Sequence, residues 1–222
     1  MPSNIFLPKP SIVIEAFKDL WEEYELFKNY ILTVAIVYIS MTAAYYLVSL
    51  FKNFLLKSKT FFADFLFSIE WFSKYVPGIL LGCLLIFWFP NSELTQFLFA
   101  FLLIFFSFFI KVQNELKKIN YEFIDAAKGF GADEKFILKN VKWKIIQPEI
   151  INHLIKLHLY FWTAIILFEF IKDDFGMGII FKQVLMFKDL SGFIALILIT
   201  GATIYLGSWA LKYLKKKFFF WG

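Results

Sequence analysis

The chain has 222 residues, of which 60% are hydrophobic and 18% are charged, and its net charge is +5. A soluble domain of this length carries more charge on its surface, so the composition excludes that class and predicts a protein embedded in a membrane. All 23 basic residues are Lys, which excludes sites that need the planar fork of an Arg side chain, and the single Cys83 excludes a disulfide within the chain.

Residues 1–28 are predicted to form an amphipathic segment outside the lipid. Ser11 is a suitable N-cap for a helix that extends to Tyr24, and Glu15 and Asp19 follow early in that helix. The first four residues lack the basic start and apolar core of a secretory signal, so no cleavable signal peptide is expected.

Five membrane-spanning helices are predicted, three within residues 29–110 and two within residues 151–214. A helix needs about 20 apolar residues to cross the hydrocarbon core of a bilayer. Four uncharged runs approach this length, and they are Asn29–Phe51, Tyr75–Ser92, Leu94–Ile110 and Leu190–Leu211. The remaining span is centred on the shorter run Leu157–Phe168, which suffices if Lys156 extends toward one interface and Glu169 lies near the other. The whole chain is therefore expected to be a single all-α transmembrane domain.

A further helix is predicted between the first two spans. Its apolar residues follow helical spacing, and they are Phe62, Phe65, Leu66, Ile69 and Phe72. The polar residues between them take other faces, so this helix is expected to lie at the inner interface or to pack under the spans.

The distribution of Lys predicts the orientation of the chain. One set of loops, together with the C-terminal tail, contains sixteen Lys, the other set contains six, and Lys156 lies inside a span. Because Lys-rich loops remain on the cytoplasmic side, the loop 111–150 and the tail 215–222 are expected inside and Met1 outside.

The loop 111–150 contains a helix, a turn and a second helix. Phe123, Ala126, Ala127 and Phe130 share one helical face, and the two small Ala side chains let another surface approach it closely. Gly131 then provides a turn, because Gly adopts positive φ without strain. A second helix follows Asp133, a good N-cap, and carries apolar residues at Phe136, Ile137 and Val141. The pattern leaves two interpretations open, an amphipathic loop that packs on its own chain and a docking surface for a partner.

This loop resembles the cytoplasmic loop of binding-protein-dependent ABC importer permeases. The family pattern is Glu-Ala-Ala, three residues, Gly, nine residues, Ile, one residue and Leu-Pro. Asp125-Ala126-Ala127, Gly131 and Val141 follow this pattern, whereas Asp125 replaces Glu and Trp143-Lys144 replaces Leu-Pro. The resemblance implies that the loop docks an ATPase subunit. The residues implied in docking are Phe123, Asp125, Ala126, Ala127, Phe130, Gly131 and Ala132.

Three other segments extend the resemblance over nearly the whole chain. Leu7-Pro8-Lys9-Pro10 is similar to the segment after the first span in permeases for sulfonates, taurine, nitrate and thiamine precursors. Pro77 begins a run that resembles a Pro-led span of the family, and Trp162 and Glu169, followed by Gly176-Met177-Gly178, resemble its Trp…Glu…Gly-Leu-Gly segment. These permeases have six spans, so the chain is expected to be this fold without its first span.

The resemblance implies a transport subunit without enzymatic activity, in the bacterial inner membrane. It would pair with a second copy, bind two ATPase subunits and accept a small solute from an external solute-binding protein. Pro77, Trp162 and Glu169 would line or gate the path, with Glu169 shaping the external gate. The chain lacks a P-loop, so ATP would be bound by the partner, and no other cofactor, metal or nucleic acid is expected.

Several alternatives compete with this interpretation. An ion-coupled secondary transporter would use Glu169 as its titrating group, although such proteins usually carry more acids within the membrane. A scaffold that only recruits an ATPase is a second alternative. Glu169 can also simply reach interfacial water, and Trp162 can be a packing residue. His153 and His158 lie five residues apart, which is poor spacing for a shared metal.

Overall fold

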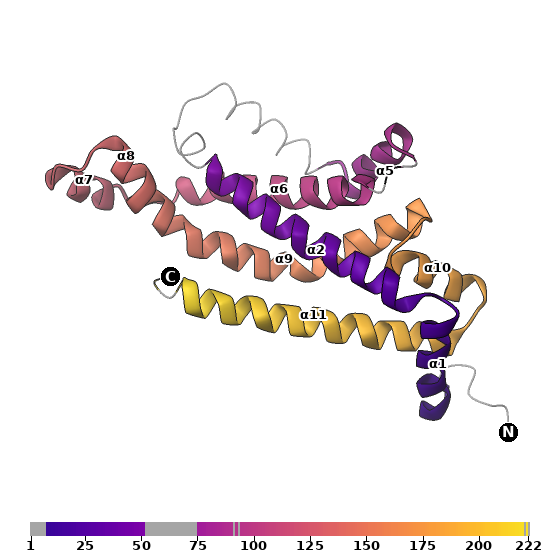
Figure 1. Cartoon of the computed structure of the whole chain (residues 1–222). Coiled ribbons are helices and arrows are strands. Elements are labelled where there is room, and N and C mark those ends of the chain that lie inside the picture. Colours follow the sequence, from indigo (N-terminus) through magenta and orange to yellow (C-terminus); the bar gives the residue numbers. More distant parts are fainter. Residues whose placement is uncertain (1–7, 52–74, 91, 93, 220, 222) are drawn as a thin grey trace.

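The computed structural model describes residues 8–51, 75–90, 92, 94–219 and 221, and within these residues it contains helices and no strands (Figure 1). The predicted helix at 62–72 lies outside the described residues. The elements are α1 (Pro10–Glu22), α2 (Leu26–Leu50), α5 (Gly78–Trp88), α6 (Leu94–Leu116), α7 (Tyr121–Gly129), α8 (Glu134–Phe136), the π-helical segment η1 (Ile137–Lys142), α9 (Trp143–Lys172), α10 (Met177–Met186) and α11 (Leu190–Phe218).

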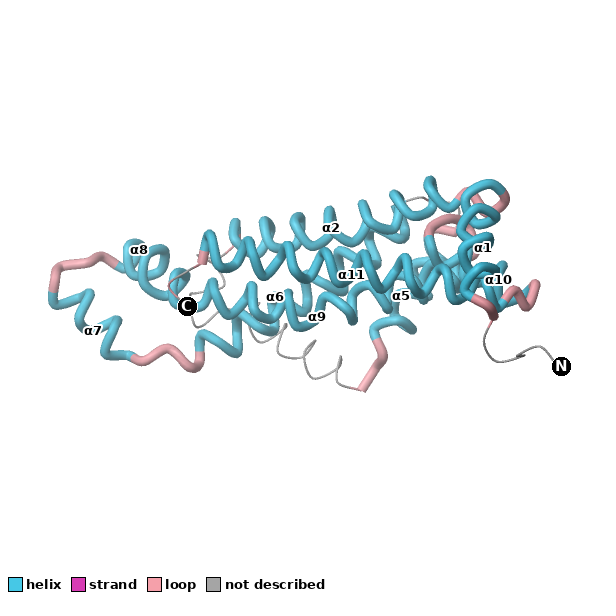
Figure 2. Tube along the Cα trace, turned by 90° about the horizontal axis from the view of Figure 1, so that it is seen from below, coloured by secondary structure: helices cyan, strands magenta, loops and turns pink. Residues whose placement is uncertain are grey.

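Four long helices, α2, α6, α9 and α11, lie alongside one another and form the body of the protein (Figures 1 and 2). Among the described residues these four are long and apolar enough to cross a membrane, with α9 continuous with the segment from Glu134. Their facing sides bury one apolar core that includes Val37, Ile104, Phe108 and Phe161. The described part of the chain is therefore all-helical, with helices suited to a multi-pass membrane protein.

Two shorter apolar helices lie at the end of the body where α2 and α11 begin (Figure 1). The predicted span Tyr75–Ser92 contains α5, whose 11 residues cover about 16 Å, roughly half of the hydrocarbon core. The other is α10, which lies between the last two predicted spans. Its buried residues Met177, Ile180 and Val184 pack against α1 and α11.

The N-terminal helix is present, but its predicted cap is wrong. Helix α1 begins at Pro10, follows Lys9 and has no side-chain cap, so Ser11 is the second residue of the helix. Proline suits the first helical position because its φ is already fixed near the helical value and its missing N–H has no helical partner there. The helix buries Val13, Ala16 and Leu20.

The polar loop is shorter than predicted because the helices on both sides extend into it. Helix α6 continues to Leu116, beyond the predicted limit at Ile110, and α9 begins at Trp143. Between them, α7 and α8 form a hairpin that protrudes beyond the end of α11 (Figure 2). The π-helical turn η1 joins α8 to α9 without a break, so the hairpin and the long helix α9 are mechanically continuous.

Candidate functional site

The turn after α7 is a Schellman motif. Gly131 has φ +80°, its N–H donates to the carbonyl of Lys128 at 2.9 Å, and the N–H of Ala132 donates to the carbonyl of Ala127 at 3.0 Å. Ala127 and Ala132, the two positions that are usually apolar in this motif, both pack against the main core. The predicted turn at Gly131 is confirmed, and the motif fixes the angle between α7 and the second arm of the hairpin.

The second half of the hairpin is capped as the sequence predicts. The Asp133 carboxylate accepts a hydrogen bond from the N–H of Phe136 at 2.7 Å, which satisfies one of the free donors at the start of α8. Ile137 and Leu138 are then buried against the core. The hairpin is therefore held to the body through its second arm.

One face of α7 remains free of the chain's own core. Phe123 is 60% exposed, Phe130 is 93% exposed and Ala126 is also exposed. These three lie on one stripe of the helix, whereas Ile124 is buried and anchors the opposite edge. Exposed aromatic rings of this size, on a hairpin that protrudes from the body, are typical of a protein interaction surface.

The predicted docking residues therefore separate into two groups. Phe123, Asp125, Ala126 and Phe130 present side chains to the outside, and Asp125 lies within 3.8 Å of Lys128. The remaining three, Ala127, Gly131 and Ala132, shape and anchor the turn through the contacts described above. The helical spacing could not separate these roles, because it does not show which side of α7 faces the core.

At the opposite end of the body, Glu169 of α9 is fully buried, at 0% exposure. The hydroxyl of Thr33 on α2 donates to its carboxylate at 2.8 Å, and the backbone N–H of Gly178 on α10 donates to Oε2 at 3.1 Å. The N–H of Met177 in turn donates to the Thr33 hydroxyl at 2.8 Å. The carboxylate thus joins three helices, and the interpretation that Glu169 reaches interfacial water is wrong.

The contact is close because two glycines line it. A Cβ on Gly176, which has φ +102°, would overlap the Glu169 carboxylate, and a Cβ on Gly178 would overlap the backbone of α9 at Ile166 and Phe170. The side-chain oxygen of Asn29 also accepts from the N–H of Gly176 at 2.8 Å. The start of α10 is therefore seated directly on α9, with α2 completing its hydrogen bonds.

Sequence analysis missed the contribution of Asn29 and Thr33. They are polar, lie one turn apart in a helix that is otherwise mostly apolar, and are buried on the same face. Two polar side chains at this spacing in a membrane helix are expected to have partners. That pattern is the signal that could have identified them.

Trp162 is a packing residue in this chain. It is fully buried, its indole N–H donates to Nε2 of His158 at 3.0 Å, and its ring meets Tyr38 edge to face. Nδ1 of His158 lies 2.8 Å from the hydroxyl of Ser208, so the imidazole connects α9 with α11. The described residues contain no group of three or more His, Cys, Asp or Glu that could hold a metal.

A mostly apolar groove of about 490 Å³ lies between α5, α6 and α9. Its walls include Leu81, Leu85, Trp88 and Phe106, and one polar pair is formed by Ser107 and His153, whose Oγ and Nε2 are 2.8 Å apart. Pro77 is the exposed residue before α5, and its neighbours Val76 and Gly78 line the groove. Of the three predicted path residues, Pro77 is thus the one that adjoins an open surface.

The sequence model of the family described as binding-protein-dependent transport system inner membrane component matches residues 47–220. The match covers α5, α6, the protruding hairpin, α9, α10 and α11 in full. No curated protein sequence matches the chain.

Proposed function

Because the chain belongs to the family of binding-protein-dependent transport inner membrane components, we propose that it forms one half of a solute path and is driven by ATPase subunits docked on the α7–α8 hairpin. Membership makes the chain a permease component of an ABC importer and not a member of an enzyme family. The proposal adds the place of docking, a second copy of the chain as the other half, and an external binding protein that delivers a small solute.

The exposed stripe on α7 is the observation that carries the docking proposal. Phe123 and Phe130 present large apolar surfaces on the outside of a hairpin that protrudes beyond the body. Insertion of such rings into a pocket of a partner would bury apolar area, which is the main source of affinity in protein interfaces. Lys128 is exposed on the same helix, so an acidic rim around the partner's pocket would complement it.

Continuity between the hairpin and α9 supports coupling. Rotation of a docked ATPase would move α8, and η1 transmits that movement into α9 because no loop interrupts the two. At its other end, α9 carries Glu169, which holds α10 and α2. One rigid element would thus link the docking surface to the helices at the opposite end, as rigid-body alternating access requires.

Capture of the partner tests the docking proposal. The tagged chain, extracted from membranes of its own cell in mild detergent, should retain an ATP-hydrolysing subunit. Ala126→Glu places a charge on the exposed stripe without disturbing the core and should reduce recovery of that subunit by at least about tenfold, because an unpaired charge buried in an interface is strongly unfavourable. Lys135→Gln on α8 is the matched control and should retain it. Equal recovery with both variants would contradict docking on α7.

A further inference from the structure

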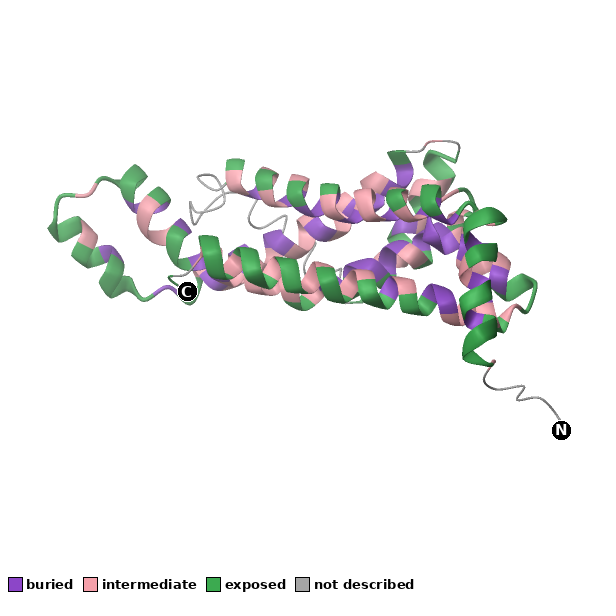
Figure 3. Cartoon of the chain, turned by 60° about the horizontal axis from the view of Figure 1, so that its bottom comes forward, coloured by how far each residue is buried: buried purple, intermediate pink, exposed green. Residues whose placement is uncertain are grey.

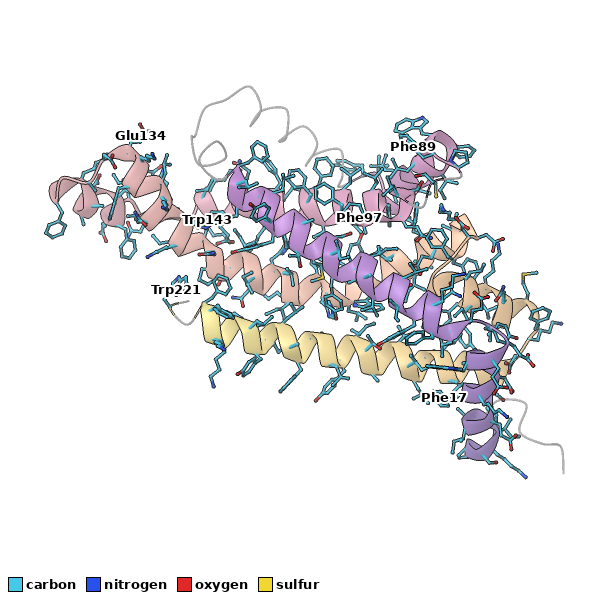
Figure 4. All side chains as sticks on the ribbon, in the orientation of Figure 1. Phe17, Phe89, Phe97, Glu134, Trp143 and Trp221 are labelled. Atoms are coloured by element: carbon cyan, nitrogen blue, oxygen red, sulfur yellow. The ribbon has the colours of Figure 1, made fainter. Side chains whose placement is uncertain are left out.

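A hydrogen bond from Trp221 links the segment after α11 to the start of α9. The indole N–H of Trp221 donates to the backbone carbonyl of Lys144 at 2.9 Å, and Figure 4 shows Trp221 beside the first turns of that helix. Pro148 lies four residues after Lys144 and has no N–H to give to this carbonyl. The indole therefore occupies a position that the proline leaves open, and it brings the end of α11 against α9.

This contact places five lysines at one end of the body. The α11 lysine cluster consists of Lys144 on α9 and Lys212, Lys215, Lys216 and Lys217 on the last turns of α11. Within the described part of the chain none of these five lies within 4.0 Å of a carboxylate, whereas several other lysines do, as in the pairs Lys118–Glu115 and Lys182–Asp173. Like charges one turn apart repel each other, so an anion from outside the chain would stabilise the cluster.

The outward face of α11 changes character toward its C-terminal end. Tyr205 and Leu206 are exposed, and Trp209 and Tyr213 follow with 62% and 57% exposure and stacked rings. Lys212 lies between these two rings in the sequence, and the other three lysines come after them. Exposed residues recur along the whole of α11 (Figure 3). Tyr and Trp concentrate at the level of lipid headgroups, between the hydrocarbon and water. The order of apolar, aromatic and basic residues therefore places the α11 lysine cluster at the headgroup layer.

We propose that the α11 lysine cluster binds the phosphate headgroup of an anionic phospholipid, and that Trp221 organises the site by holding α11 against α9. Each lysine next to a membrane surface adds a favourable electrostatic free energy to the attraction of anionic lipids. A lipid fits better than an acidic protein partner for two reasons. The α7–α8 hairpin protrudes farther from the body than the end of α11, so a docked protein would meet the hairpin first (Figure 2). The stacked rings of Trp209 and Tyr213 favour the boundary between lipid and water.

Lipid retention by the purified full-length chain tests this proposal without requiring the ATPase. Native mass spectrometry in mild detergent would compare dioleoyl phosphatidylglycerol with dioleoyl phosphatidylcholine, which share acyl chains and differ in headgroup charge. The unmodified chain should prefer the anionic lipid by roughly tenfold, and replacement of Lys212, Lys215, Lys216 and Lys217 by Gln should reduce that preference to about twofold. Equal retention of both lipids by the unmodified chain would overturn the proposal.

A control removes the same number of charges from the opposite end. Replacement of Lys9, Lys18, Lys28 and Lys188 by Gln should leave the lipid preference unchanged, and an equal loss in this variant would show a general effect of net charge and overturn the assignment of a site. Trp221→Phe keeps the ring and removes the donor, so it should weaken retention by about threefold, the usual effect of one lost hydrogen bond. Unchanged retention in this variant would contradict the organising role of Trp221.

Two further outcomes separate other anions from a lipid. Excess glycerol phosphate carries the headgroup charge without acyl chains and should displace little bound lipid; complete displacement would indicate a site for a soluble phosphate and overturn the proposal. If the four-lysine variant keeps its lipid preference but loses the ATPase subunit on capture, the cluster is a protein contact instead of a lipid site.

Discussion

The backbone N–H of Gly178 donates a hydrogen bond to the buried carboxylate of Glu169, at 3.1 Å. The two residues belong to different helices, and Thr33 of a third helix donates to the same carboxylate. A buried acceptor of this kind is costly to leave unpaired and, when paired, fixes the relative positions of its donors. The Glu169 contact therefore holds α2, α9 and α10 as one unit at the end of the body away from the hairpin.

Replacement of Glu169 should lower the stability of the protein, and the loss should be larger when more of the carboxylate's acceptor oxygens are removed. Glu169→Ala leaves the Thr33 hydroxyl and the Gly178 N–H without their acceptor and should destabilise the protein by about 2–4 kcal/mol, while Glu169→Gln retains one acceptor oxygen and should cost about 1 kcal/mol. Thermal unfolding in detergent measures both. Glu25→Gln, at an exposed acid near the same end, is the control, and an Ala variant as stable as this control would contradict the linking role.

Gly178→Ala tests the close approach of α10 to α9. The added methyl group would overlap backbone atoms of Ile166 and Phe170, which cannot rotate away, so the expected loss is about 1–3 kcal/mol. Gly201→Ala in α11 is the matched control, because no atom lies within 4 Å of its Cβ position, and it should be neutral or stabilising. The same thermal assay applies, and equal melting temperatures for the two variants would argue against tight seating of α10.

Gly131→Ala tests whether the Schellman turn presents α7 to a partner. An alanine at φ +80° costs about 1–2 kcal/mol, so the turn should loosen and capture of the ATPase subunit should fall by about tenfold. Gly129→Ala, two residues earlier, lies in the last turn of the helix with open space around it and should leave capture unchanged or improve it. Normal recovery with Gly131→Ala would show that docking does not depend on this turn.

The orientation of the chain, predicted from Lys alone, is accessible to thiol labelling. In a Cys83→Ser background, a cysteine at Ser92 should react with a membrane-impermeant reagent in intact cells, and one at Lys216 should react only after the membrane is opened. Labelling in the reverse order would place the hairpin on the outside, where no ATPase could reach it.

Local features of the fold were predictable because they depend on neighbours in the sequence. Gly131 and Asp133 set the turn and the cap through contacts within a few residues. The ends of the spans were less accurate, since α6 and α9 continue as helices through polar residues outside the hydrocarbon. Charge therefore marks the edge of the lipid better than the end of a helix.

Long-range features could not be predicted from the sequence alone. Thr33 and Glu169 are 136 residues apart, and only the packing of α10 excludes water from the carboxylate that the sequence placed at the interface. Trp162 is similar, because its burial against His158 and Tyr38 depends on how α2, α9 and α11 pack. The sequence identified Glu169 and Trp162 as unusual, and the arrangement of the helices determined their contacts.

Crosslinking from the tip of α7 tests the central claim most directly. Phe130→Cys in the Cys83→Ser background would be labelled with a photoreactive maleimide, irradiated in membranes of the native cell, and the adduct identified by mass spectrometry. Phe187→Cys, at a similarly exposed site on the opposite end, is the control. Our account predicts an adduct with an ATP-hydrolysing subunit from position 130 and none from position 187. The absence of such an adduct from position 130, or equal adducts from both positions, would contradict it.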